Sequence, residues 1–181
     1  MIVLSHRGYW RDVSEKNTRL AFERSFSLGF GTETDLRDCG SKLVISHDMA
    51  DRSAMLVEDF FDLYTSFDKQ LPLALNIKAD GLQSELKRLL ETYKIHNYFV
   101  FDMAVPDGLA YINRGLMTYT RQSEFESTPA YYEIAQGVWL DEFFSHWITD
   151  EVIEQHLAIG KSICIVSPAV SYTHLTLPTK A

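Results

Sequence analysis

The sequence has few cysteines, few basic residues and no long apolar run, and each shortage excludes a class of protein. Its two cysteines, Cys39 and Cys164, stand far apart and form no C-x-x-C pair. This spacing favours reduced, structural thiols over a disulfide framework and fits an intracellular protein. No apolar stretch reaches the roughly 18 residues of a membrane-spanning helix, so no transmembrane segment is predicted.

Basic residues are outnumbered, with 17 lysines and arginines against 25 aspartates and glutamates and a formal net charge of −8. Nucleic-acid-binding surfaces need clustered lysine and arginine, so the composition argues against a nucleic-acid partner. An acidic chain can still hold one small cationic pocket for a single phosphate. No cleavable leader precedes the first apolar run, and we therefore expect a cytoplasmic protein.

Short apolar runs alternate with amphipathic segments along most of the chain. The expected strands are Met1–Ser5, Thr32–Leu36, Leu71–Ile77, Tyr98–Phe101, Leu116–Thr120, Gly137–Leu140 and Ser162–Val166, with a further extended piece at Leu43–Ser46. The expected helices are Thr18–Leu28 with Asn17 as its cap, Val57–Tyr64, Leu82–Tyr93, and segments near Pro106–Asn113, Pro129–Ala135 and Asp150–Leu157. This alternation predicts βαβ units and a parallel sheet.

The expected architecture is an α/β fold, a TIM-type (β/α)8 barrel that is incomplete here, with about seven strands over residues 1–168. A complete barrel typically needs about 250 residues, so a chain of this length is short for one. No repeat or linker divides the chain, which predicts one domain. Residues 169–181 lack helical periodicity and resemble a translated library adapter, so we expect a non-native tail after a C-terminal truncation.

Chemically capable side chains follow several of the expected strands. They are His6 and Arg7, Glu33 and Asp35, His47, and Asn76 and Lys78. The C-terminal ends of barrel strands meet at the mouth of the barrel, so these side chains are expected to gather there. Alternation along a strand puts Glu33 and Asp35 on one face, where two carboxylates suit Mg²⁺ or Ca²⁺.

The third of these strands repeats the same spacing. Asn76 and Lys78 share a face, so an amide oxygen can complete a metal shell while an ammonium group faces a phosphate. Each residue alone has an ordinary explanation, since strand-end charges are often solvated and a lone histidine is often a core residue. Together, on successive strand ends, they predict a functional site.

Four motifs point to one family. They are His6-Arg7-Gly8, Asn17-Thr18 followed by Ala21-Phe22, Gly29 before Glu33-Thr34-Asp35, and His47-Asp48. Their order and approximate spacing resemble the glycerophosphodiester phosphodiesterase family, a barrel fold related to the phosphatidylinositol-specific phospholipases C. The resemblance covers roughly the first 80 residues and is mainly architectural from there to about residue 168.

The resemblance implies a phosphoric diester hydrolase of lipid metabolism. His6 and His47 would be the acid/base pair, with the assignment of acid and base left open. Glu33 and Asp35, with Asn76, would hold a divalent cation, Mg²⁺ or Ca²⁺, and Arg7 and Lys78 would bind the phosphate. The expected substrate is a small phosphodiester, whose alcohol group the sequence leaves open together with the oligomeric state.

The sequence departs from the family's pattern in two places. Glu15 cannot be aligned with the family's Glu-Asn-Thr loop, and Asn76 stands where the family has a third metal-binding carboxylate. Losing one negative charge weakens cation binding. Two alternatives therefore stay open: a degenerate barrel that binds a phosphorylated ligand without turnover, and a barrel enzyme acting on sugar phosphates, for which only Lys78 is suitably placed.

Overall fold

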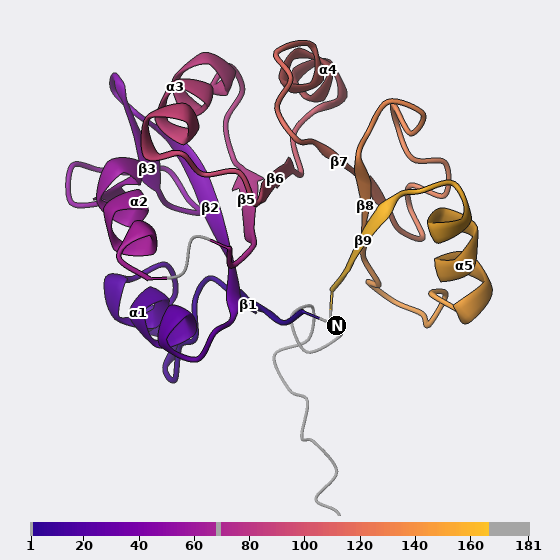
Figure 1. Ribbon diagram of the computed structural model, residues 1–181, viewed down its shortest axis with the longest axis horizontal. Helices are drawn as coiled ribbons and strands as arrows, with labels where there is room; N and C mark the ends of the chain where they lie inside the picture. Colours follow the sequence, from indigo (N-terminus) through magenta and orange to yellow (C-terminus); the bar gives the residue numbers. More distant parts are fainter. Residues whose placement is uncertain (1, 68–69, 167–181) are drawn as a thin grey trace, which may run out of the picture. The chain divides into compact units, whose positions relative to one another are not determined.

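The computed structural model describes residues 2–67 and 70–166, which fall into two compact units, one ending at Thr118 and the other beginning at Tyr119 (Figure 1). Each unit contains its own sheet. The expected non-native tail, residues 169–181, lies outside the described residues. Within the described ranges, no helix is long and apolar enough to cross a bilayer.

The sheet of the first unit has the strand order β4-β3-β2-β5-β6, with β1 also paired to β2. The strands are β1 (Leu4–His6), β2 (Gly31–Cys39), β3 (Lys42–Ile45), β4 (Met55–Leu56), β5 (Leu73–Ile77) and β6 (Tyr98–Phe101). The pairs β1–β2, β2–β5 and β5–β6 are parallel, whereas β3 and β4 form an antiparallel arm. β1 pairs with the first residues of β2, and β3 pairs with the last residues of β2.

Four helices and one short 3-10 turn connect these strands. They are the 3-10 turn Val13–Glu15, α1 (Arg19–Ser27), α2 (Val57–Thr65), α3 (Gln83–Tyr93) and α4 (Val105–Asn113). The first three α-helices lie along one face of the sheet (Figure 1). Their aromatic rings make the core, with Phe22 and Phe60 in an edge contact at 4.7 Å and Phe26 and Tyr64 at 5.5 Å between centroids.

Because successive side chains of a strand point to opposite faces, one face of the sheet is apolar and the other is polar. Leu36 on β2 and Leu73 and Leu75 on β5 are fully buried in the core shared with the helices. Side chains one position away point to the opposite face, so Asp35 and Asn76 face away from that core. The sheet thereby separates an apolar, helix-covered face from a polar one.

The second unit contains a parallel sheet of order β7-β8-β9. Its elements are β7 (Tyr119–Gln122), β8 (Gly137–Leu140), α5 (Asp150–Ala158) and β9 (Ser162–Ile165). Thr149 caps α5 by accepting the backbone N–H of Val152. His156 on α5 is buried between Tyr132 and Gln122, with ring contacts of 2.6 and 2.9 Å, and is therefore structural.

The mixed α/β fold with parallel sheets is confirmed, whereas barrel closure, the number of barrel strands and the single domain over 1–168 stay predictions. The helix expected near Pro129–Ala135 is wrong. That segment forms a turn in which Tyr131 O accepts the N–H of both Ile134 and Ala135. Tyr131 has φ +42°, in the left-handed region, so a right-handed helix does not run through it. The fifth parallel strand begins at Tyr119 rather than Leu116.

Candidate active site

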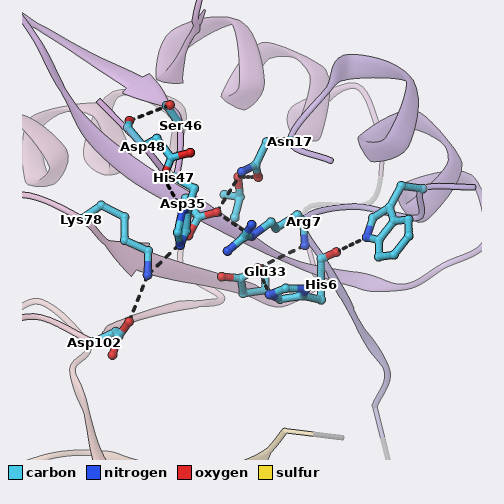
Figure 2. Close-up of polar contacts among 12 residues, drawn as sticks. His6, Arg7, Asn17, Glu33, Asp35, Ser46, His47, Asp48, Lys78 and Asp102 are labelled. Carbon is cyan, nitrogen blue, oxygen red and sulfur yellow. Dashed lines mark hydrogen bonds and ion pairs between the residues drawn. The ribbon is translucent and has the colours of Figure 1, made fainter. Parts of the chain in front are cut away.

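Strand register brings the predicted residues together on the polar face of the first unit. His6 lies opposite Glu33 across β1 and β2, and Asp35 lies opposite Asn76 across β2 and β5. Lys78 follows β5, where its N–H donates to Leu36 O at 2.8 Å. The carboxyl ends of three parallel strands therefore bring these residues to one place, where Figure 2 shows His6, Glu33, Asp35 and Lys78.

The turn after β1 directs Arg7 back toward β2. Arg7 has φ +58° and Gly8 φ +83°, both in the left-handed region. A Cβ at position 8 would lie 2.7 Å from the Ala21 Cβ, so glycine lets this turn pack on α1. The Arg7 N–H donates to the Glu33 backbone oxygen at 3.0 Å and to its carboxyl oxygen at 3.1 Å, which fixes the turn to β2.

Asp35 is completely buried and is the centre of the polar contacts. Its Oδ2 lies 2.8 Å from Arg7 Nε, and its Oδ1 lies 3.6 Å from Lys78 Nζ. Lys78 also lies 3.0 Å from Asp102, at the end of β6. Figure 2 shows Arg7 and Lys78 converging on Asp35 from opposite sides, so this acid orients both predicted phosphate-binding cations.

Asn17 is a site residue that the sequence predicted as a helix cap and as part of a family motif, without a role in the site. The cap of α1 is Thr18, whose side chain accepts from Ala21 N. Asn17 instead has φ +59°, donates from Nδ2 to Asp35 at 2.8 Å and accepts from the Thr34 hydroxyl at 3.0 Å. The signal for this was asparagine itself, which tolerates the left-handed region better than most residues.

Glu33 and His6 share an environment that favours their neutral forms. Burial and the neighbouring Asp35 charge raise the pKa of Glu33 to about 8, despite the nearby Arg7 cation. Burial and the Arg7 charge lower the pKa of His6 to about 4. His6 Nε2 lies 3.8 Å from Glu33 Oε2, and at neutral pH this contact joins two mainly uncharged groups.

His47 lies beside this group on the antiparallel arm. Ser46 N–H, at the end of β3, donates to Asp35 O at 3.0 Å, which places the His47 backbone next to β2. The His47 ring is about half exposed, and its Nδ1 lies 2.9 Å from Asp48 Oδ1. His47 lines a pocket of about 680 Å³ together with Arg7 and Asn17.

Three oxygen donors on the polar face fit a hard divalent cation. Asn76 Oδ1 and Asp35 Oδ1 are buried without a hydrogen-bond partner, and burial together with the Asp35 charge raises the pKa of Glu33, an effect that a bound cation would oppose. Mg²⁺ and Ca²⁺ take carboxylate and amide oxygens. The donor set is two carboxylates and one amide; within the described ranges, no group of three histidine, cysteine, aspartate or glutamate residues has metal-binding geometry.

No family model matches the sequence, and no curated protein matches it significantly. Solved structures match the fold. A candidate glycerophosphodiester phosphodiesterase from Galdieria sulphuraria has a TM-score of 0.75 and 17% identity, covering 91% of this chain and 83% of that one. Glycerophosphodiester phosphodiesterases from Agrobacterium tumefaciens and Thermotoga maritima have TM-scores of 0.70 and 0.52, 13% and 14% identity, and cover 91% of this chain and 86% and 94% of theirs.

The fold of this chain is therefore that of solved glycerophosphodiester phosphodiesterases. The resemblance found in the sequence is confirmed at the level of fold, since identities this low establish architecture alone.

Proposed function

We propose that this protein is a phosphodiesterase that hydrolyses a small, glycerophosphodiester-like substrate. One observation carries the proposal: His6, Glu33 and Asp35 meet the cations Arg7 and Lys78 on one face of the sheet, at the carboxyl ends of parallel strands. Cations fixed beside a polar pocket are what a phosphate diester needs when negative charge builds on its non-bridging oxygens. The fold shared with solved phosphodiesterases supports this reaction class.

Phosphate binding falls to Arg7 and Lys78. Arg7 contacts Asp35 through Nε, so the terminal guanidinium nitrogens are the donors that meet the substrate. Arg7 also lines the pocket that His47 borders. Asp35 and Asp102 each lie within ion-pair distance of Lys78 Nζ, which fixes the position of this side chain. This arrangement gives little support to a Schiff-base aldolase acting on sugar phosphates.

Proton transfer falls to the two histidines. With its pKa lowered to about 4, His6 is neutral before the reaction and, as general base, takes the proton of the attacking hydroxyl of the substrate's own alcohol group. This first step gives a cyclic phosphate, which water opens in a second step with the two histidines in exchanged roles. His47 is exposed to the pocket and oriented by Asp48, and it protonates the departing alkoxide.

Glu33, Asp35 and Asn76 would hold Mg²⁺ or Ca²⁺. When bound, the cation supplies Lewis-acid stabilisation of charge on the phosphoryl oxygens. A positive charge beside Glu33 favours its carboxylate form, so cation binding and loss of the Glu33 proton are coupled. The buried oxygen of Asn76 without a hydrogen-bond partner supports this assignment.

The test is hydrolysis of glycerophosphocholine with Mg²⁺ or Ca²⁺ by His6→Ala and His47→Ala. Each variant is expected to lose about 10²-fold or more of kcat, the usual contribution of a general acid or base. His146→Ala is the matched control, because that ring is largely exposed and contacts only Glu142 among the described residues. Full turnover by either site variant, with circular dichroism unchanged, would contradict the assignment.

A second candidate is a module that binds a phosphodiester without cleaving it. Asn76 favours it, because an amide brings one charge fewer than a carboxylate to the cation. Calorimetric titration of glycerophosphocholine, with and without Mg²⁺, separates the two functions when run beside the hydrolysis assay. Saturable binding with no product at any cation concentration would establish the binding module.

A further inference from the structure

Two loops of the second unit present phenylalanine rings to solvent. Phe125 lies in the loop after β7 and is 71% exposed, and Phe144 lies in the loop after β8 and is 77% exposed. Their ring centroids are 5.6 Å apart in an edge contact, and Phe143 lies 5.9 Å from Phe125. These three residues are called the phenylalanine tip. Large, clustered apolar rings in water are uncommon and mark interaction sites.

A hydrogen-bond network fixes the two loops to each other. The Glu124 carboxylate accepts the backbone N–H groups of Phe143 at 3.1 Å, Phe144 at 2.9 Å and Ser145 at 2.9 Å, together with the Ser145 hydroxyl at 3.3 Å. Consecutive N–H groups around an anion form a compact nest. The rings are therefore held on a fixed frame, which lowers the entropy cost of placing them in a partner.

The cation nearest the phenylalanine tip in the two loops is already paired, and the other charges there are acidic. Glu124 accepts its backbone donors, and Glu126 forms an ion pair with Arg121. Asp141 and Glu142 in the second loop add to the negative charge of Glu124, so this apolar surface is surrounded by net negative charge, as is the chain with its net charge of −8. The neighbouring hydroxyl side chains in the two loops carry no charge and are Ser123, Ser127, Thr128 and Ser145.

We propose that the phenylalanine tip binds the interface of a zwitterionic phospholipid bilayer, with the rings of Phe125 and Phe144 inserted among the lipid headgroups. Apolar side chains enter this boundary when they leave water. The nearby cation Arg121 is engaged by Glu126 rather than offered to an anionic headgroup, and the acidic chain as a whole is repelled by anionic membranes. The proposal goes beyond the proposed hydrolysis and does not depend on it.

The test is sedimentation of the intact protein with phosphatidylcholine vesicles. Binding is expected for the unmodified chain, with a loss of about tenfold in partition coefficient for Phe125→Ala or Phe144→Ala, the equivalent of burying one such ring. The double variant should lose about a hundredfold. Leu157→Ala is the matched control, because Leu157 is also exposed, at 56%, but lies on α5.

A second measurement follows the tip directly. Phe144→Trp should show a blue-shifted emission component with phosphatidylcholine vesicles, quenched by brominated lipid acyl chains. Failure of the unmodified chain to sediment would overturn the proposal, as would equal binding by the double variant. Binding only to phosphatidylserine-containing vesicles, abolished by salt, would show electrostatic attachment and would also overturn it. These measurements need no catalysis, so their outcome is independent of the hydrolysis assay.

Discussion

Asp35 shows how one buried side chain organises a site made from four separate segments. Arg7 comes from the turn after β1, Asn17 from the loop before α1, and Lys78 from the end of β5, and all three contact the same carboxyl group. A buried charge is tolerated only when it is paired and hydrogen-bonded. Removing any one partner therefore affects both the stability of the fold and the orientation of the remaining partners.

Asn17 offers a way to separate side-chain bonding from backbone conformation. Asn17→Gly keeps the left-handed φ of +59° accessible but removes the bonds to Asp35 and Thr34. We expect it to lower the free energy of unfolding by about 2 kcal/mol, the size of a lost hydrogen bond to a charged group. Asn17→Ala should cost about 1 kcal/mol more, because alanine resists this conformation. Urea denaturation measures both, and equal stability of Asn17→Gly and the unmodified chain would contradict the role.

Asn76→Glu should restore a third carboxylate beside Glu33 and Asp35. The added charge is expected to tighten Mg²⁺ or Ca²⁺ binding by roughly tenfold in calorimetric titration, since the number of charged ligands tunes affinity. Asn113→Glu adds the same charge at an exposed position at the end of α4 and serves as the control. An unchanged affinity in Asn76→Glu would show that position 76 lies outside the cation site.

Single residues were predicted where a local rule decided their placement. Alternation along a strand and the position of strand ends placed Glu33, Asp35, Asn76 and Lys78 on one face. The role of Asn17 was not predictable, because its partner lies 18 positions away and meets it only through the shape of the loop. Electrostatic contacts of this kind depend on tertiary structure that no periodicity encodes.

Elements with strong periodicity were predicted to within about one residue. This holds for α2, α3, β6 and β8, whose apolar residues repeat with the spacing of helix or strand. β4 was missed because its two residues, Met55 and Leu56, are too few to show alternation. The turn at residues 130–134 was mistaken for a helix because a few apolar residues after a proline satisfy both structures.

Because the Glu124 carboxylate holds the loop after β8, the free energy of unfolding should depend on pH. Partial desolvation would raise the pKa of Glu124, but the N–H groups of Phe144, Ser145 and Phe143 outweigh it and lower this pKa to about 2. A carboxyl group whose pKa is lowered in the folded state stabilises that state at pH values above its ordinary pKa of 4.5. This stabilisation is lost as the pH falls toward 2. Glu124→Gln should therefore unfold at lower urea than the unmodified chain at about pH 6, and the difference should shrink near pH 2.5. A pH-independent difference would contradict this account.

For the molecule as a whole, the sequence predicted an alternating α/β architecture, and solved structures of 13–17% identity share it. Hydrophobic periodicity survives such divergence because it follows from burial, whereas identity at surface positions does not. Barrel closure could not be predicted from the sequence, because closure depends on strand tilt and stagger rather than on a local pattern of residues. The described strands pair within each of the two units.

Cation binding should be visible in the stability of the whole protein. A ligand at a hundredfold its Kd stabilises the folded state by about 2.7 kcal/mol. Differential scanning calorimetry in excess Mg²⁺ or Ca²⁺ is therefore expected to give a higher Tm than in chelator. Asp35→Asn, which removes one carboxylate, should abolish the shift. An identical Tm in both buffers would favour the phosphate-binding module without a cation.

The antiparallel arm formed by β3 and β4 carries one wall of the pocket on a segment separate from the buried acids. His47 and pocket residues such as Met49, Asp51 and Ser53 follow β3, whereas the buried acids belong to β2. Grafting a new sequence into residues 49–54 would therefore reshape the wall of the pocket and leave both Asp48 and the parallel register of the sheet intact. Directed evolution confined to this short stretch is a practical route to altered specificity, because the charged centre is inherited unchanged by every member of such a library.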